Sequence, residues 1–400
     1  MSVLFEPVRI GRLEAKNRFV RSATFEGRGD GHGAVTKSAL SLYRTLARGD
    51  IGTIITGFMY VRQDGKGGRS ALGIDRDELI PGLRELAAEI KADGSRAVFQ
   101  LHHGGGQVLK GVTGGDPRGA SPDSRDFFTR RTTGTRRPFS VEELAGVTAA
   151  FGAAARRARE AGADAVQLHA AHGYLLSEFL SPFHNRRDDA YGSDTAGRYR
   201  LLGETIAAVR AEAGDDFPVL VKMNIDDGTP TPGMTPGLAA DYAARMVADG
   251  VDCLELSAGG LVAPFVLCRG EAHPEDFAGF LPWPARKVFA RALAKTPQPP
   301  FVEAYNGRAA APVKAALGSA PLALVGGMRT LARMEECVTS GVADLISMSR
   351  PLVREPGLVA KLADDPTTVP GCTNCSRCLA ACFHDLPIRC YEQGLPDRKR

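Results

Sequence analysis

This sequence of 400 residues has no long apolar run, no leader pattern and no block of basic residues. No stretch reaches the roughly 18 consecutive apolar residues that a membrane-spanning helix requires. The opening residues, Met1 to Phe5 followed by Glu6, lack the charged-then-apolar pattern of a secretion signal. We therefore expect a cytoplasmic protein that does not enter a membrane.

The charge balance of the chain is nearly even. Lys and Arg together number 50 and Asp and Glu number 46, which gives a net charge of +4. No basic run alternates with aromatic residues, so nucleic acid is not an expected partner. With 44% apolar and 24% charged residues, the composition is typical of a globular protein with a large buried core.

The eight cysteines are distributed unevenly along the chain. Five of them lie between Cys372 and Cys390, and the others are Cys253, Cys268 and Cys337. Disulfides are rare in cytoplasmic proteins, so clustering of this kind favours metal binding or redox chemistry over disulfide bridges.

Short apolar segments rich in Val and Ile alternate with longer amphipathic segments from Asn17 to about Leu362. Strands that are apolar throughout are buried on both faces, which is typical of a parallel sheet covered by helices. Eight such strands with crossover helices close into a barrel. The sequence therefore predicts the α/β class, with a (β/α)8 TIM barrel at residues 1–365 and a Cys-rich tail at 366–400. The eight expected strands are Arg18–Ala23, Gly52–Thr56, Ala97–Leu101, Ala163–His169, Pro218–Asn224, Asp252–Ser257, Leu322–Gly326 and Asp344–Met348.

Amphipathic periodicity predicts helices between these strands. Ser140, with Glu143 three residues later, forms a capping box that opens one of them. The segment Pro300–Tyr305 could make a ninth strand, but we interpret it as the entry to a helix ending near Leu317, because eight strands already close the barrel. The other helical patterns include Val141–Ala161, Arg198–Glu212, Leu238–Asp249 and Leu331–Ser340.

Three long insertions each follow an expected strand: His102–Pro138, Leu176–Thr195 and Ala258–Pro282. Barrel enzymes assemble their sites from the loops at the C-terminal face, so we expect all three there. The segment Arg130–Arg137 carries four Arg residues. We interpret it as a solvated loop, and contact with the 2′-phosphate of NADPH is the alternative.

The fourth strand runs into Gln167-Leu168-His169-Ala170-Ala171-His172-Gly173-Tyr174. Two His residues and a Tyr just past a strand end could converge on one ligand, because an imidazole N–H can donate to a carbonyl oxygen and a phenol can deliver a proton. The alternative is that they are loop and packing residues. A metal site of the HxxH kind is weaker, since no third ligand is placed by the sequence.

This segment resembles the signature of the Old Yellow Enzyme family. The resemblance continues through the whole barrel, from Phe5-Glu6-Pro7 to Ser349-Arg350-Pro351. It implies an FMN-dependent oxidoreductase. Because no GxGxxG motif follows the tail, we expect the single-domain form of the family. The matching residues are His169-Ala-Ala-His172-Gly173-Tyr174-Leu175-Leu176, Phe179-Leu180-Ser181-Pro182 and Asn185-Arg186-Arg187-Asp188-Asp189-Ala190-Tyr191-Gly192.

The resemblance implies roles for the polar residues of this signature. His169 and His172 would hydrogen-bond the carbonyl oxygen of an enone substrate, and Tyr174 would protonate the α-carbon. Two such donors stabilise the negative charge that develops on the oxygen during reduction. The expected reductant is NADH or NADPH.

The resemblance also implies FMN contacts along the strand ends. Lys222, at the inner end of a strand, would sit beside flavin N1 and O2, where a cation stabilises the anionic reduced ring. Phe25 departs from the family, because relatives often carry a hydrogen-bonding residue there. The implied cofactor-binding residues are Ser22, Ala23, Thr24, Gly57, Gln100, Lys222, Gly326, Gly327, Ser349 and Arg350.

The tail contains the pattern Cys372-x2-Cys375-x2-Cys378-x11-Cys390, with Cys382 as an alternative ligand. Thiolates at such spacings bind a [4Fe–4S] cluster or zinc. The pattern resembles the branch of 2,4-dienoyl-CoA reductase and trimethylamine dehydrogenase, whose cysteines hold a [4Fe–4S] cluster. Three alternatives stay open for the tail: an iron–sulfur cluster, zinc, or thiols without metal.

The sequence therefore predicts an FMN-dependent NAD(P)H oxidoreductase that reduces an activated C=C bond of a small enone-type substrate. Two alternatives are a flavin-dependent dehydrogenase or amine demethylase, and a flavin-binding redox sensor that acts through the tail. An amine substrate would require an aromatic cage. The loose candidates for such a cage are Tyr60, Phe265, Trp283 and Tyr305. A homo-oligomer is left open.

Overall fold

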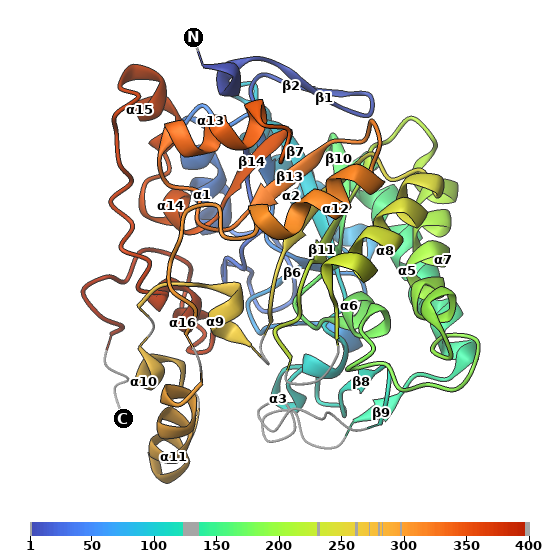
Figure 1. Ribbon diagram of the computed structural model, residues 1–400. Helices are drawn as coiled ribbons and strands as arrows, with labels where there is room; N and C mark the ends of the chain where they lie inside the picture. The colour runs from blue at the N-terminus through green and yellow to red at the C-terminus, as the bar shows by residue number, and fades with distance from the viewer. Residues whose placement is uncertain are drawn as a thin grey trace.

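The computed structural model describes residues 2–122, 136–229, 233–260, 263–271, 273–278, 281, 283–296 and 298–396. Parallel strands form its centre, and the pairing of β7 with β10 closes them into a barrel (Figure 1). Around the barrel the order is β3, β4, β7, β10, β11, β12, β13 and β14, and β14 pairs with β3. Their bounds are β3 (Phe19–Arg21), β4 (Thr53–Ile55), β7 (Arg96–His102), β10 (Ala165–Ala170), β11 (Val219–Asn224), β12 (Cys253–Ser257), β13 (Leu322–Val325) and β14 (Leu345–Met348).

All eight expected strands are confirmed, and so is the TIM-barrel class. The residues of β10, β11 and β12 are buried along their whole length, as expected for strands that pack against side chains both inside and outside a barrel. Continuous burial explains why these segments read as apolar runs and not as alternating patterns.

An N-terminal hairpin of β1 (Val8–Ile10) and β2 (Leu13–Ala15) closes one end of the barrel. Its Ile10 and Leu13 pack in one buried cluster with interior side chains of the strands, among them Val98 and Leu220. This plug seals the N-terminal end of the barrel, which leaves the C-terminal strand ends for a site.

The helices surround the barrel (Figure 1). Helix α5 begins at the predicted capping box, in which the Ser140 side chain accepts from the Glu143 N–H and the Glu143 carboxylate accepts from the Ser140 N–H. The segment 300–305 forms no strand, and α12 begins at Gly307, as predicted. The helices of the barrel wall are α1 (Lys37–Ala47), α2 (Ile80–Lys91), α5 (Val141–Glu160), α7 (Thr195–Ala213), α8 (Pro236–Ala248), α12 (Gly307–Ala316) and α13 (Leu331–Thr339).

Short elements decorate this frame. Strands β5 and β6 extend the sheet beyond β7, and β8 pairs with β9 in a separate two-stranded ladder. Within the part of the chain that the structure describes, no helix is long and apolar enough to span a membrane. The short elements are β5 (Met59–Tyr60), β6 (Leu72–Gly73), β8 (Arg118–Gly119), β9 (Arg137–Pro138), α3 (Lys110–Thr113), α6 (Leu175–Leu180), α9 (Pro264–Leu267), α10 (Pro274–Phe277), α11 (Trp283–Ala294), α14 (Arg350–Arg354), α15 (Leu358–Asp364), α16 (Arg377–Cys382) and the 3-10 turns Val3–Phe5, Gln63–Gly65, Asp77–Leu79 and Gly105–Gln107.

The arginine-rich segment corrects one expectation. Arg130 and Arg131 lie outside the described residues, but Arg136 is buried, with Nη2 3.1 Å from Oε1 of the buried Glu178. The solvated-loop interpretation is therefore wrong for Arg136, because a buried carboxylate requires a buried cation as its partner. Arg137 is exposed and pairs with Glu143.

The tail returns to the barrel after α15 and runs beside α9 and α10 (Figure 1). Ala380 of α16 packs in one buried cluster with Phe265, Phe277 and Leu293. Farther along the tail, the Ile388 N–H donates to the backbone oxygen of Glu26, which lies in the loop after β3, the first barrel strand. The tail around Ile388 thus covers the C-terminal side of the barrel near β3.

Candidate functional site

A cavity of about 180 Å³, partly open to solvent, lies where the barrel strands end. Its walls come from the ends of β3, β7, β10, β11, β12, β13 and β14 and from the tail. The lining includes Ser22, Ala23, Thr24, Phe25, Phe58, Gln100, His169, His172, Tyr174, Lys222, Ser257, Cys268, Tyr305, Gly326, Gly327, Ser347, Ser349, Arg350, Asn374, Cys378, Leu379, Cys382 and Ile388.

The cavity brings together every predicted catalytic and cofactor-binding residue except one. Gly57 does not line it. The Gly57 N–H donates to the Glu26 carboxylate and to the Tyr43 hydroxyl, so this peptide faces the barrel wall. Of the three long insertions, only 258–282 contributes described residues to the lining, namely Leu267 and Cys268.

The three polar side chains after β10 point into one small region. The backbone turns sharply there, with φ of +64° at His172 and +76° at Gly173. Asn224 holds this turn, because its Oδ1 accepts from the His172 N–H at 3.2 Å. The His169 ring lies 5.1 Å from the His172 ring and 4.9 Å from the Tyr174 ring, centroid to centroid. The loop geometry thus converts a sequence motif into a convergent group of donors.

Burial sets the protonation states of these side chains. It lowers the pKa of His169 and of His172 well below the ordinary value, so both imidazoles are neutral at pH 7. Burial raises the pKa of Tyr174, and the neighbouring Cys382 adds to the rise, so the phenol stays protonated. Within the described part of the chain the Tyr174 hydroxyl has no hydrogen-bond partner. The group therefore offers neutral N–H donors and one transferable proton.

An aromatic wall stands beside Tyr174. Phe25 stacks on Phe58 with centroids 5.0 Å apart, and His102 stacks on Phe58 at 4.2 Å. The edge of the His102 ring meets Tyr174 at 4.4 Å. Both ring nitrogens of His102 are buried and have no partner among the described residues. His102 was not among the predicted site residues, although it follows Gln100 by two positions.

A buried polar network forms the inner end of the cavity. Lys222 Nζ donates to Ser22 Oγ at 2.7 Å and lies 3.3 Å from Glu255 Oε2. Ser22 and Ser347 both donate to Glu255 Oε1, at 2.7 Å and 2.6 Å. Gln167 donates to Glu255 Oε2 at 2.9 Å and accepts from Gln100 at 2.7 Å. The network therefore fixes the orientation of Gln100 and Lys222 before any ligand binds.

Glu255 supplies the negative charge of this network. Burial opposes its ionisation, but the Lys222 ammonium and the hydrogen bonds outweigh burial, so the pKa of Glu255 lies below the ordinary value. Burial lowers the pKa of Lys222, and Glu255 partly offsets that effect. Glu255 was not predicted as a site residue. Its sequence signal is a single acidic residue within an apolar strand, Leu254-Glu255-Leu256.

The opposite end of the cavity carries glycines and a guanidinium. Gly326 and Gly327 follow β13 with φ of +124° and +73°, which exposes their backbone to the cavity without a Cβ. Ser349 follows β14 and shares a 2.7 Å hydrogen bond with Thr24, while Arg350 adds a cation. A phosphate would fit this end, and a flavin ring would fit the end with Lys222 and Gln100. The donor set is thus suited to FMN.

Four tail cysteines line a second, smaller cavity of about 20 Å³. They are Cys372, Cys375, Cys378 and Cys390, the four that the sequence pattern predicted as metal ligands. Cys382, the alternative ligand, lines the larger cavity instead. Among the described residues, no three of these sulfurs lie within 4.8 Å of one another. The four thiols therefore surround a space and do not meet at one point.

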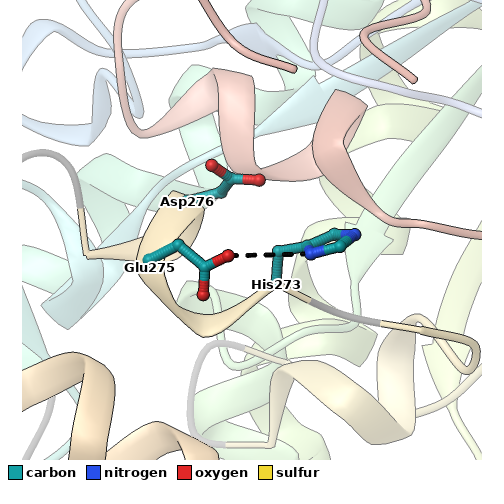
Figure 2. A group of neighbouring side chains, drawn as sticks. All are labelled: His273, Glu275 and Asp276. Carbon is teal, nitrogen blue, oxygen red and sulfur yellow. Dashed lines mark ion pairs between the residues drawn. The ribbon is translucent and has the colours of Figure 1, made fainter. Parts of the chain in front are cut away.

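Figure 2 shows a third group, His273, Glu275 and Asp276, whose ligand atoms lie within 4.8 Å of one another. The Asp276 carboxylate already receives the Arg377 guanidinium at 2.9 Å, and the Asp276 backbone oxygen lies 2.7 Å from His384 Nε2. These bonds join α10 to the first residue of α16 and to His384, which follows that helix. The group is therefore an anchor for the tail, since its carboxylate is paired with a cation.

A closed (β/α)8 barrel whose strand ends offer a buried cation, an amide pair and a glycine pair beside a guanidinium has the arrangement expected of an FMN-binding oxidoreductase. The chain belongs to the NADH:flavin oxidoreductase / NADH oxidase family, which it matches over residues 3–262. Membership confirms the predicted Old Yellow Enzyme family and an FMN-dependent NAD(P)H oxidoreductase.

Two curated relatives are similar over most of their length. A 4,4'-dithiodibutanoate disulfide reductase of Rhodococcus erythropolis is 31% identical over 95% of this chain and 93% of its own. An NADPH dehydrogenase of Geobacillus sp. is 33% identical over 89% of this chain and 92% of its own.

Solved structures share the fold. A 2-naphthoyl-CoA reductase in complex with 2-naphthoyl-CoA has a TM-score of 0.84 and 25% identity, covering 97% of this chain. This chain spans only 56% of that protein's length. An old yellow enzyme homologue from Zymomonas mobilis has a TM-score of 0.70 and 24% identity over 92% of this chain and 94% of its own.

Proposed function

We propose that the protein is an ene-reductase, which uses NADH or NADPH to reduce a C=C bond conjugated to a carbonyl group. The observation that supports this proposal is the convergence of His169, His172 and Tyr174 in one cavity with a flavin-compatible donor set. When bound, FMN supplies the hydride transfer between the nicotinamide and the substrate. The work of the protein is to hold the substrate and move one proton.

The two imidazoles bind the carbonyl oxygen of the substrate. Each is neutral and offers one N–H, and the position of His172 is fixed by its 2.8 Å contact with Ser257 Oγ. Donors aimed at the oxygen stabilise the negative charge that builds up there as the β-carbon is reduced. Because burial keeps them uncharged, they polarise the carbonyl without requiring an anionic substrate.

Tyr174 delivers the proton to the α-carbon. The side chain is partly buried and its phenol is protonated, and its ring is held against His102 and His169. Positioned proton donors accelerate such steps by about 10²–10⁴-fold. The aromatic pair Phe25 and Phe58 on the same wall limits the access of water to the site.

FMN would be held at both ends of the cavity. Gln100 and Lys222 would hold the flavin ring at the inner end, together with the backbone of Ser22 to Thr24. Gly326, Gly327 and Arg350 would bind the phosphate. Gly57 is not part of this set, because its N–H is bonded to Glu26 and Tyr43.

Amine oxidation is not favoured by the lining of the cavity. Among the described residues that line it, none is Asp or Glu, so a cationic substrate would find no counter-charge. Tyr305 lines the cavity, but Tyr60 and Phe265 do not, and the side chain of Trp283 lies outside the described part of the chain. The candidates whose side chains the structure describes therefore do not assemble an aromatic cage.

The four-cysteine cavity fits a [4Fe–4S] cluster better than a single zinc ion. Zinc binds thiolates at about 2.3 Å, which would bring the sulfurs to roughly 4 Å from one another. No three described sulfurs approach within 4.8 Å, whereas a cubane cluster spaces its thiolates more widely. Cys372, Cys375, Cys378 and Cys390 would hold the cluster, and it would supply one-electron transfer.

Anaerobic stopped-flow kinetics with a Tyr174→Phe variant test the function. We expect NAD(P)H to reduce the flavin at the wild-type rate, and reoxidation by an enone such as 2-cyclohexenone to slow by about 10²–10⁴-fold. Tyr199→Phe is the matched control, because Tyr199 donates to Asp249 on the outside of the barrel. Unchanged reoxidation by Tyr174→Phe with full FMN content would contradict the role of this residue.

A failure of the wild-type protein to be reoxidised by any enone would reject ene-reduction itself. Flavin reduction by an amine, with none by NADH or NADPH, would favour the dehydrogenase alternative. Bound FMN with negligible turnover, together with a partner that binds according to the oxidation state of the tail, would favour a redox sensor.

A further inference from the structure

The cavity at the barrel strand ends, called the flavin cavity from here on, shares a wall with the four-cysteine cavity. Arg350 and Cys378 line both of them. Arg350 begins α14 directly after β14, so its backbone belongs to the barrel and its side chain reaches the tail. A single side chain thus faces the phosphate end of one cavity and the thiols of the other.

Arg350 joins the tail to the loop after α9 through one nitrogen. Its Nη1 donates to Ser376 Oγ at 3.1 Å, to the backbone oxygen of Asn374 at 3.4 Å and to that of Arg269 at 3.0 Å. Asn374 and Ser376 both have left-handed backbone, with φ of +59° and +57°. Such conformations persist in residues other than glycine only when their surroundings hold them. Arg350 is part of those surroundings.

The tail also forms one side of the flavin cavity. Asn374, Cys378, Leu379, Cys382 and Ile388 all line it. Yet within residues 366–396, the part of the tail that the structure describes, α16 with its six residues is the only helix, and the segments on either side of it have no regular structure. Small segments with little secondary structure usually depend on a metal or cross-link to hold their shape. A metal centre among the four cysteines would therefore stiffen a wall of the flavin site.

We propose that binding of FMN and loading of the four-cysteine cavity are thermodynamically coupled through Arg350. This inference rests on the proposed iron–sulfur site. Loading fixes the loop from Asn374 to Cys378, which holds the Arg350 side chain in place at the phosphate end of the flavin cavity. Coupling between two binding sites is reciprocal, so bound FMN raises the affinity for the cluster by the same factor as the cluster raises the affinity for FMN.

Arg354 provides a matched control one helical turn later. It lines the four-cysteine cavity, with Nη1 3.3 Å from Cys390 Sγ, but it does not line the flavin cavity. Both residues are cations of α14 beside the thiols. Only Arg350 faces the two cavities, so only its substitution is expected to break the coupling.

The test measures FMN affinity with and without iron. The full-length protein is reconstituted anaerobically with iron and sulfide, or stripped with a chelator, and the dissociation constant of FMN is measured by quenching of its fluorescence. Typical coupling factors are about 5–150-fold. We expect FMN to bind roughly tenfold more tightly to the loaded wild-type protein than to the stripped one. The same ratio is expected for Arg354→Gln, and a ratio near one for Arg350→Gln and Arg350→Lys.

Iron analysis of each sample separates a failure of the coupling from a failure of the proposed iron–sulfur site. Wild-type protein that takes up iron but binds FMN equally well in both forms would overturn the coupling and leave the iron–sulfur site standing. A ratio that persists in both Arg350 variants would overturn the role of Arg350. Protein that takes up no iron would reject the metal site and the coupling together.

Discussion

Lys222 and Glu255 lie directly opposite each other on the neighbouring strands β11 and β12, with Nζ 3.3 Å from Oε2. Both side chains are almost fully buried. The pair sits beneath the flavin end of the cavity, and Ser22 contacts both partners. The Glu255 carboxylate therefore neutralises Lys222, the cation that the sequence analysis assigned to the flavin site.

We expect removal of one partner of this pair to destabilise the barrel far more than removal of both. Glu255→Leu leaves the Lys222 ammonium buried without a counter-charge, which costs about 3–5 kcal/mol. Replacing both residues, as in Lys222→Met/Glu255→Leu, is expected to cost much less. Urea unfolding of the FMN-free proteins measures both values. Equal losses in the single and double variants would contradict the pairing.

We expect Glu26 to make stability depend on pH. Burial raises the pKa of its carboxyl group to about 7 from an unfolded value of 4.5, although Arg21 and the Gly57 N–H oppose the rise. Between these two values the folded state keeps a proton that the unfolded state has released. Stability is therefore full below about pH 4.5 and falls as pH rises to about 7, by about 3 kcal/mol in total.

Glu26→Gln is the variant that isolates this effect. It has no titrating group at that position, so its free energy of unfolding should fall less than the wild-type value between pH 5 and pH 8. Chemical denaturation at both pH values gives the comparison. A wild-type protein whose stability rises relative to the variant over this range would show that the carboxyl is not held protonated.

We expect the tail cysteines to separate into two functional groups. Cys390→Ser removes a ligand of the four-cysteine cavity and should lower the iron content several-fold after anaerobic reconstitution. Cys382→Ser should leave the iron content near the wild-type value, because Cys382 lines the flavin cavity. Iron analysis and the absorption spectrum give the result. The opposite pattern would assign Cys382 as the ligand in place of Cys390.

We expect His102→Phe to stabilise the protein by about 1–2 kcal/mol. The change keeps a ring against Phe58 and Tyr174 and removes two buried nitrogens that lack partners among the described residues. His103→Phe is the control, because His103 Nδ1 accepts from the Gly105 N–H at 3.1 Å and its other nitrogen contacts Asp64. The midpoint temperature of thermal unfolding should rise for His102→Phe and fall for His103→Phe.

Local pattern was sufficient for the frame of the molecule and for much of its site. The eight strands and the capping box of α5 follow from periodicity and spacing within short segments, because burial on both faces leaves an uninterrupted apolar run. His169, His172 and Tyr174 lie within six residues of one another, so one turn brings them together.

Other features depended on contacts between distant segments. Gly57 follows a strand end, as the other predicted flavin contacts do, but Glu26 and Tyr43 take up its N–H. Arg136 looked like part of a solvated basic loop until Glu178 was found beside it. In each case the deciding partner is separated in sequence and is brought near only by packing.

The sequence by itself determined the barrel, the family and the residue types at the strand ends, because each is encoded in a local run of residues. Only the tertiary structure decided that Glu255 neutralises Lys222 and that Cys382 turns toward the flavin cavity while Cys390 joins the other thiols. Closure of the barrel brings strands β11 and β12 into register, and the return of the tail sets which way each thiol faces. The physical reason is that the spacing of residues along one helix or strand sets which way their side chains point. Contacts between side chains of different elements depend instead on how the whole fold packs.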